Sequence, residues 1–343
     1  MPPGPTPIRG SNHPTMEDVA HEAGVSRALV SLVFRDSPQV SQARRDRVKA
    51  AALRLGYQPN AIARNLASRT TRTLGVLMND LHNPFFADIY DGIESAASER
   101  GYQLLLTAGR HRDGIEQGAI ETMLQHRVDG MMLISPRLDD SVITSVSLKA
   151  PLVVVGRIVE DGKVDSIMAD EPRGALAALQ HLGSLGHRNI VHIDGGAGAG
   201  AEPRRSGYLL AMKQLGLGLP DVVSGDFTEM SGVTAAAELL QRPTLPTAIF
   251  AGNDMVAIGL IDAFADAGVR VPEDVSIVGY DNTAIAHLRA ISLTTIDQPR
   301  VEMGQMAVHL LDQRVQGQRT ASVTHLSQPT LVARRTTAAP RYS

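Results

Sequence analysis

From Leu74 onward, short apolar runs of β type alternate with longer stretches of helical composition. The expected strands are 74–78, 103–108, 130–135, 151–156, 189–193, 247–252 and 275–280. The expected helices are 85–99, 115–127, 171–185, 204–215, 230–241 and 254–267. This alternation predicts parallel sheets that carry helices on both faces. About 270 residues of it exceed one ordinary domain, so we expect two lobes of this kind.

The chain before this region has the pattern of a small helical unit. Thr15 followed by Asp18 has the spacing of a helix N-cap with an acidic group in the first turn, and Ser26 and Ser41 stand at two later helix starts. Gly24 supplies a bend between the first two helices. Three short helices are expected, over 16–23, 27–34 and 42–55. Such an arrangement is typical of a helix-turn-helix unit.

Two segments on either side of this unit have weaker patterns. Residues 1–14 are rich in Pro and Gly, and we expect a disordered tail there. The Ala-rich piece Pro59–Ser68 is too short to be a stable helix by itself in water. It is therefore expected to be a hinge that becomes helical only when a partner holds it.

Charge is distributed unevenly along the chain. Residues 1–72 contain 11 Lys/Arg and 5 Asp/Glu, whereas the whole chain has a net charge of -3. A basic head on an acidic body favours a protein that touches phosphates with one end only. The alternative is a solvated basic helix without a partner, and charge alone does not separate the two.

Composition excludes several classes of protein. The absence of cysteine rules out disulfides and thiolate metal sites and suits a reducing interior. No apolar run reaches the length of a membrane-spanning helix. The first residues lack the apolar core of a secretory signal. We therefore expect a cytoplasmic protein that associates with the nucleoid and not with a membrane.

Several segments are recognisable together. The head and hinge of the LacI/GalR family of bacterial transcription regulators are similar to MEDVAHEAGVSRALVSLVFRDSPQVSQARRDRVKAAALRLGYQPNAIARNLAS. The effector-binding core of that family resembles DLHNPFF, LGHRNI, RRSGY, AGNDMVAIGL, VPEDVSIVGYDN and LTTIDQP, which occur here in the same order. The resemblance extends from about Thr15 to Arg335.

This resemblance implies an all-α helix-turn-helix head plus an α/β core of two doubly wound parallel-sheet lobes, as in periplasmic sugar-binding proteins. The chain would cross between lobes near Ala169–Asp170, near Ile296–Gln298 and near Ser327–Thr330. The implied domains are the tail 1–14, the head 15–59, the hinge 60–72, an N-terminal lobe of 73–169 and 298–327, and a C-terminal lobe of 170–297 and 328–343. Without the C-terminal leucine helix of the tetrameric members, a homodimer is expected.

The resemblance also implies how the head contacts DNA. The second helix would lie in the major groove, with Arg27 on guanine and Ala28 on a thymine methyl group, followed by Ser31. Leu66 would wedge between base pairs in the minor groove. The expected backbone contacts are Ser26, Ser31, Arg35 and Asn60. Arg27 could instead contact only phosphate or solvent, and Leu66 could instead pack on its dimer mate. The family often has Thr where this chain has Leu29, so one phosphate contact is missing.

Ligands of parallel α/β lobes bind at the carboxyl ends of strands, and polar residues of the matching motifs stand there. The expected effector-binding residues are Asn83, Phe85, Phe86, Arg157, Arg204, Phe227, Asn253, Asp281 and Gln298. Aromatic faces, amides, a carboxylate and guanidinium groups suit a polyhydroxylated ligand such as a sugar. Plainer alternatives exist: Asn253 and Asp254 could cap a helix, Phe85 and Phe86 could be core residues, and Asp281 could hold a turn. His187 is expected to be structural.

The sequence also bears on three other functions. An enzyme is disfavoured, because GGAGAG (195–200) is not a clean dinucleotide-binding loop and no hydrolase or Walker motif occurs. A solute-binding module would need export and would not need residues 15–72. An activator, or a regulator that responds to a nucleobase, stays open. The favoured function is a repressor that binds a palindromic operator as a dimer under control of a sugar-like effector, with no cofactor and no metal.

Overall fold

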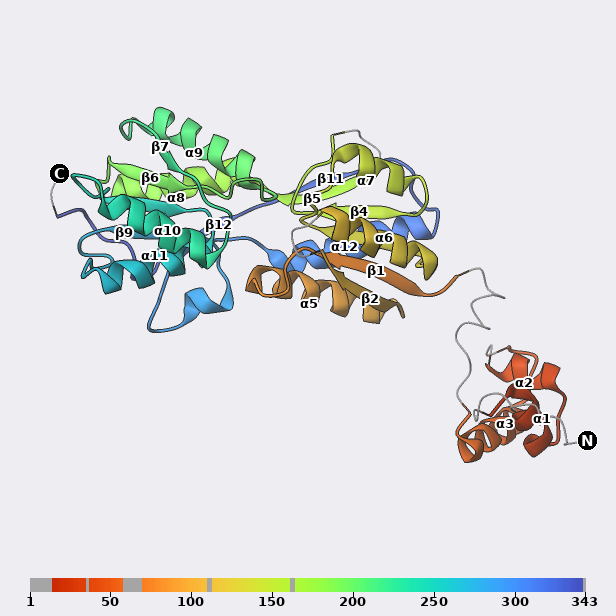
Figure 1. Cartoon of the computed structure of the whole chain (residues 1–343). Coiled ribbons are helices and arrows are strands. Elements are labelled where there is room, and N and C mark those ends of the chain that lie inside the picture. Colours follow the sequence, from red (N-terminus) through yellow and green to blue (C-terminus); the bar gives the residue numbers. More distant parts are fainter. Residues whose placement is uncertain (1–13, 35–36, 58–69, 110–112, 161–163, 342–343) are drawn as a thin grey trace, which may run out of the picture. The chain divides into compact units, whose positions relative to one another are not determined.

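The computed structural model describes residues 14–34, 37–57, 70–109, 113–160 and 164–341. The chain forms two compact units, a head within Met1–Thr71 and a core of Arg72–Ser343. Figure 1 shows both units. The expected tail up to His13 and the expected hinge from Asn60 to Arg69 lie outside the described residues.

The head consists of three helices around a small apolar core. These are α1 (Met16–Ala23), α2 (Arg27–Phe34) and α3 (Gln42–Leu55). At the start of α1 the Thr15 hydroxyl accepts from the Asp18 amide at 3.3 Å, and the Asp18 carboxylate accepts from the Thr15 amide at 2.8 Å. This capping box satisfies two amides that the helix cannot. Ser41 has the N-cap position of α3, but its side chain makes no capping hydrogen bond, which corrects the expectation.

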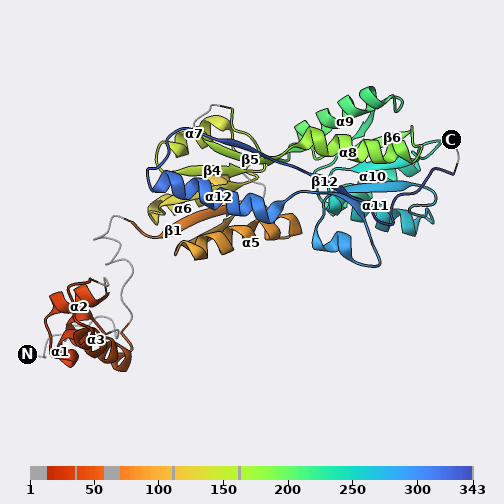
Figure 2. The same cartoon turned by 180° about the vertical axis from the view of Figure 1, so that it is seen from behind.

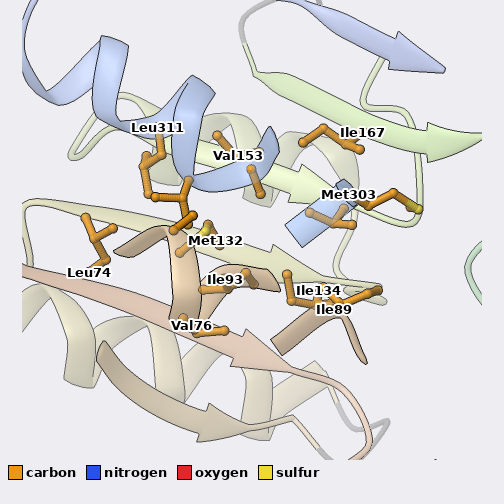
Figure 3. Close-up of a cluster of buried hydrophobic side chains, with 14 of the residues drawn as sticks. Leu74, Val76, Ile89, Ile93, Met132, Ile134, Val153, Ile167, Met303 and Leu311 are labelled. Carbon is orange, nitrogen blue, oxygen red and sulfur yellow. The ribbon is translucent and has the colours of Figure 1, made fainter. Parts of the chain in front are cut away.

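Lobe 1 of the core is a six-stranded parallel sheet in the order β11-β5-β4-β3-β1-β2. Its strands are β1 (Thr73–Met78), β2 (Gln103–Ala108), β3 (Gly130–Ile134), β4 (Leu152–Val155), β5 (Asp165–Ala169) and β11 (Thr324–Ser327). Helices α5 (Pro84–Glu99) and α12 (Arg300–Val315) cover one face, and α6 (Asp113–Gln125) and α7 (Asp140–Ser147) cover the other. The core under α5 and α12 is drawn in Figure 3, where Ile89 and Ile93 meet Met303 and Leu311 over the strands.

Lobe 2 repeats this architecture in the order β12-β10-β9-β8-β6-β7. Its strands are β6 (Ile190–Ile193), β7 (Asp221–Val223), β8 (Ala248–Ala251), β9 (Ser276–Asp281), β10 (Thr294–Asp297) and β12 (Thr330–Val332). Helices α8 (Glu171–Ser184) and α9 (Ala201–Leu215) cover one face, and α10 (Glu229–Leu240) and α11 (Asp254–Asp266) cover the other. The sheet is parallel except at β12, which runs antiparallel to β10.

The chain passes between the two sheets three times. It leaves lobe 1 after β5, returns after β10 to form α12 and β11, and crosses again to form β12. Figure 2 shows α12 lying beside α5, so a late segment completes the first lobe. The expected fold class is confirmed. Strands β5, β7, β10, β11 and β12 and helices α7 and α12 were not predicted. No helix in the described part of the chain is long and apolar enough to cross a membrane.

Candidate effector cleft and DNA-binding head

The carboxyl ends of strands from both lobes line one cavity of about 270 Å³. In each sheet the side on which successive strands are added changes between two central parallel neighbours, β1 and β3 in lobe 1 and β6 and β8 in lobe 2. At such a switch point the loops after neighbouring strands diverge to opposite faces and leave a crevice. Asn79 and Ser135 line the cavity from lobe 1, and Asn253 lines it from lobe 2.

The structure brings together eight of the nine predicted effector residues. Lobe 1 contributes three of them at the start of α5, lobe 2 contributes four, and the last follows β10 at a lobe crossing. They are Asn83, Phe85, Phe86, Arg204, Phe227, Asn253, Asp281 and Gln298. Their position does not test whether they bind an effector, but these residues, which the resemblance to the family implied, do line one cavity.

Arg204 is the buried cation of the cleft. Its Nε donates to Glu171 Oε2 at 2.8 Å, and its Nη1 donates to the carbonyl of Gly252. The guanidinium also lies 3.5 Å from the centre of the Tyr280 ring and 5.3 Å from that of Phe227. Burial by itself would lower the pKa of Arg204, but the Glu171 carboxylate raises it, so the group stays charged. Glu171 thus neutralises Arg204 and fixes its orientation.

Asp281 supplies a buried carboxyl group at the end of β9. Gln298 Nε2 donates to its Oδ1 at 2.6 Å. The pKa of Asp281 is raised to about 8, chiefly by burial; the Arg204 charge lowers it and the Asp254 charge raises it. Its backbone has a φ of 110°, which non-glycine residues rarely adopt and which turns the chain at the cleft. The group can accept or donate a hydrogen bond, depending on its proton.

Asn253 caps α11, whereas Asp254 does not have the capping role that the sequence suggested for it. Asn253 is the N-cap of α11: its Oδ1 accepts from the Val256 amide at 2.9 Å. Its Nδ2 donates to the Phe227 carbonyl at 3.0 Å, so both ends of this amide are used within the protein. Asp254 instead accepts from the hydroxyl of Thr295 at 2.6 Å and from Thr283. The capping alternative therefore holds for Asn253.

Phe227 lies against a loop made of glycines. A Cβ atom at Gly195 or Gly198 would overlap the Phe227 ring, so only glycine leaves room for it. Phe227 itself has a φ of 68°. The GGAGAG segment that superficially resembles a phosphate-binding loop here accommodates an aromatic ring beside Arg204. This gives the glycines a packing role in place of a nucleotide-binding one.

Arg157 corrects one prediction. It is not among the residues that line the cavity. Its Nη1 donates to the Leu138 carbonyl at 3.0 Å, and its Nη2 forms an ion pair with Asp140 at the start of α7. With these partners the guanidinium holds the loop between β3 and α7. Gly156, where the family commonly has Asp, does line the cavity.

Sequence reasoning missed several residues of the cleft. Arg137 reaches it from the loop after β3, and Asp226 reaches it from the loop after β7. The positive charge of Arg137 is one of the influences that lower the pKa of Asp226, after hydrogen bonds from Thr228. Both stand just beyond a strand, the position at which ligands of parallel α/β lobes bind. Strand β7 has only three residues and was not recognised.

The head presents the start of α2 to solvent. Ser26, Arg27 and Ala28 are exposed, and Ser31 is half-buried. Ser26 Oγ accepts from the Leu29 amide at 3.3 Å and so caps the helix. Arg27 Nε lies 3.9 Å from Glu17 Oε2, and both side chains are largely exposed. Three other predicted DNA-contacting residues, Arg35, Asn60 and Leu66, lie outside the described residues.

His187 matches its expected structural role. Its Nε2 lies 2.8 Å from the Ala338 carbonyl and its Nδ1 lies 3.0 Å from the Thr247 hydroxyl. Burial lowers the pKa of His187. Among the described residues, no cluster of His, Asp or Glu is arranged to hold a metal ion.

Two family models match the chain. Residues 15–60 match bacterial regulatory proteins of the lacI family, and residues 71–335 match the periplasmic binding proteins and sugar binding domain of the LacI family. Catabolite control protein A of Priestia megaterium is 35% identical over 305 residues, 87% of this chain and 91% of the relative. The ribose operon repressor of Escherichia coli K12 is 37% identical over 309 residues, 88% of this chain and 93% of the relative.

Solved structures agree with these matches. The lac repressor dimer, bound to operator and to the anti-inducer ONPF, superposes with a TM-score of 0.87 at 30% identity. The superposition covers 96% of this chain and all of that chain. The similarity to the lac repressor therefore includes both the head and the core of this chain.

Proposed function

The chain belongs to the lacI family of bacterial regulatory proteins and is a ligand-responsive DNA-binding transcription regulator, and we propose that it represses its operator as a homodimer under control of a neutral sugar. The observation that carries this is a single chain with both a basic helix-turn-helix head and a core cavity lined by groups from two lobes. The relatives that it matches are regulators, and we assign no catalytic step to the cleft.

In the head, we assign base reading to the exposed start of α2. Arg27 presents two parallel N–H groups to guanine and Ala28 presents a methyl group to thymine, contacts that the major groove permits. Phosphate contacts come from Ser26, Ser31, Arg35 and Asn60, and Leu66 wedges into the minor groove. The largely exposed Arg27 side chain supports this, because its guanidinium is at the surface of the head.

In the core, the effector is proposed to be polyhydroxylated. Arg204 uses Nε and Nη1 within the protein and directs its remaining Nη2 donor to the ligand. Asp281 offers a carboxyl oxygen beyond the one that Gln298 occupies. A donor and an acceptor held in this way match two hydroxyl groups of a sugar, and the Phe227 ring matches its apolar face.

The charge of the cleft favours a neutral sugar over a phosphorylated one. Five acidic residues line the cavity together with two arginines, and one of the arginines is neutralised by Glu171. The acidic residues are Asp80, Glu171, Asp226, Glu229 and Asp281. A phosphate would gain little from the paired guanidinium of Arg204 and would be repelled by the carboxylates of Asp80, Asp226 and Glu229.

We place the two functional lobes at 73–169 with 298–327 and at 170–297 with 328–343, and we place the protein in the cytoplasm with its DNA. Effector binding would change the relation of the lobes and thereby the order of the hinge 60–72. Because coupling is reciprocal, a sugar that weakens operator binding is itself bound more weakly by the operator complex.

The test is a mobility-shift assay on the chain's own upstream DNA at several salt concentrations. Neutral sugars such as D-ribose and D-glucose are compared with their phosphate esters. We expect binding to a palindromic site, a steep fall in affinity with salt, and a response to one neutral sugar only. A sugar that releases the protein from the DNA is an inducer, and a sugar that tightens DNA binding is a co-repressor. A response to a nucleobase alone, or the loss of all DNA binding at low salt, would refute the proposal.

Arg27→Ala tests the head directly. We expect the variant to lose roughly 10- to 100-fold in operator affinity and to discriminate less at one base pair. Arg54→Ala is the matched control, because Arg54 is an equally exposed head arginine whose partner is Glu22. Equal losses in both variants would mean that Arg27 contributes only charge.

A further inference from the structure

Arg300, at the start of α12, touches both lobes. Its Nε donates to Asp88 Oδ2 on α5 of lobe 1 at 2.9 Å, and its Nη2 lies 2.8 Å from the same oxygen. On the side of lobe 2, Nη2 donates to the Asn282 carbonyl at 2.9 Å. Nη1 donates to the carbonyl of Gln298 at 3.1 Å. The Arg300 side chain is 9% exposed, so these contacts form away from bulk water.

The lobe 2 partners of Arg300 are themselves fixed in place. Asn282 donates from Nδ2 to Asp297 Oδ1 at 2.8 Å, and its Oδ1 accepts from Arg334 at 2.7 Å. Both Asp281 and Asn282 have positive φ, 110° and 56°, which costs free energy for non-glycine residues. This strained pair of residues aims the Asn282 carbonyl at Arg300 and the Asp281 side chain at the cleft.

A short path joins Arg300 to the cavity. The carbonyl of Gln298 accepts from Arg300, and the side-chain amide of the same residue donates to Asp281 at 2.6 Å. Gln298 and Asp281 both line the cavity, whereas Asp88 and Arg300 do not. A shift of Asp281 in the cavity is therefore transmitted through Gln298 to the ion pair of Arg300 with Asp88, which joins the two lobes.

We propose that Arg300 is a positioning residue that latches lobe 1 to lobe 2 through Asp88, and that it sets the arrangement of the cleft in which Asp281 and Gln298 meet the ligand. A guanidinium suits this task, because its planar donors bind a carboxylate and two carbonyls at once. Arg300 also lies 3.6 Å from Asp297 Oδ1, so loss of Asp88 leaves the guanidinium with a carboxylate on the side of lobe 2 only.

The experiment is hydrogen–deuterium exchange on the full chain without any ligand. It measures the exchange rate of backbone amides in lobe 2 after a substitution in lobe 1. In Asp88→Asn we expect the segment 280–284 of lobe 2 to exchange faster by on the order of three- to tenfold, because the interlobe pair is weakened. Strand β6, in the same lobe but away from Arg300, should not change. A merely local role of Asp88 would alter α5 alone.

Asp91→Asn is the matched control, since it removes the same charge from an exposed position of the same helix. The Asp88→Asn/Arg300→Gln double variant should exchange no faster at 280–284 than Arg300→Gln alone, and Arg300→Lys should fall between Arg300→Gln and the unchanged chain. The latch is overturned if the effect of Asp88→Asn stays within α5, if Asp91→Asn reproduces it, or if the two substitutions add independently.

Discussion

At the scale of single residues, lobe 2 buries two carboxyl groups, Asp281 at the cavity and Asp254 behind it. Burial raises the pKa of Asp254 to about 6 and that of Asp281 to about 8. Because the two groups influence each other, they titrate as a pair. Asp254 receives hydrogen bonds from Thr283 and Thr295, which favour its ionised form. We therefore expect the proton of the pair to reside on Asp281.

The first prediction concerns pH and stability. An acid whose pKa is raised by folding binds a proton in the folded state that the unfolded state has lost, so stability falls as pH rises from about 4 to about 8. We expect Asp281→Asn to remove this contribution. In urea unfolding at about pH 5 and about pH 8, the variant should gain free energy of unfolding relative to the unchanged chain at the higher pH.

Asp262→Asn on the exposed side of α11 is the control for this prediction, and it should leave the pH dependence as it is. Comparison between variant and unchanged chain is needed because burial lowers the pKa of His192 to about 4, and that group acts in the opposite direction. An equal pH dependence in Asp281→Asn would show that Asp281 is ionised throughout.

The residues of the cleft were predictable to the extent that backbone position decides them. Asp281 ends β9, a strand that the apolar pattern predicted. Arg204 lies within α9 and Gln298 follows the unpredicted strand β10, so only the resemblance to the family pointed to these two. Arg157 also follows a strand, yet its long side chain turns to Asp140 and to the Leu138 carbonyl. Periodicity places the backbone of a residue and not the end of its side chain. The choice of rotamer depends on partners that are distant in sequence.

At the scale of elements, each lobe contains a pair of helices that pack closely because each helix has a glycine at the contact. On α5 and α12, a Cβ atom at Gly92 would overlap the Val301 carbonyl, and one at Gly304 would overlap the Ile89 carbonyl. On α10 and α11, Gly232 and Gly259 lie equally close to the backbone of Val256 and Glu229. In both pairs the backbones approach to a distance that no side chain permits.

The second prediction follows from this packing. Gly92→Ala should lower the free energy of unfolding by about 1–3 kcal/mol, because α5 and α12 must move apart. Gly118→Ala in the middle of α6 should raise it by up to about 1 kcal/mol, since nothing lies within 4 Å of its Cβ position and alanine favours the helix. Chemical denaturation of both variants measures the difference. Two effects of the same sign would contradict the close approach.

Three edge strands with a weak apolar pattern were not predicted. Strand β11 has the sequence THLS and is mostly exposed, and β7 and β12 have three residues each. Such edge strands owe their conformation to pairing with β5, β6 and β10. Asp165 shows how much this depends on distant partners, because Arg314 and Arg319 both bind it and the Val323 amide donates to it. None of these pairings is local in sequence.

At the scale of the whole molecule, the head and the core are separate compact units, whereas the two lobes share one threaded chain. Every residue that lines the cavity lies between Asn79 and Gln298, and the core also needs α12, β11 and β12 to complete both sheets. The core should therefore fold and bind its ligand without the head. A cut after β5 would separate β11 from the rest of its sheet, and a cut after β10 would remove one strand from each sheet.

The third prediction tests this division. A fragment of residues 72–343 should keep the affinity of the full chain for the responsive sugar within about threefold, because a coupling through DNA is absent in both when no operator is present. It should lose measurable operator binding, since the basic residues of the head are removed. Isothermal titration calorimetry and a mobility shift give the two readings. A second variant, which keeps the head but ends at Gln318 and so lacks β11 and β12, is expected to lose cooperative unfolding. If the fragment 72–343 were unfolded while the variant ending at Gln318 stayed native, the head and not the returning strands would be what completes the core.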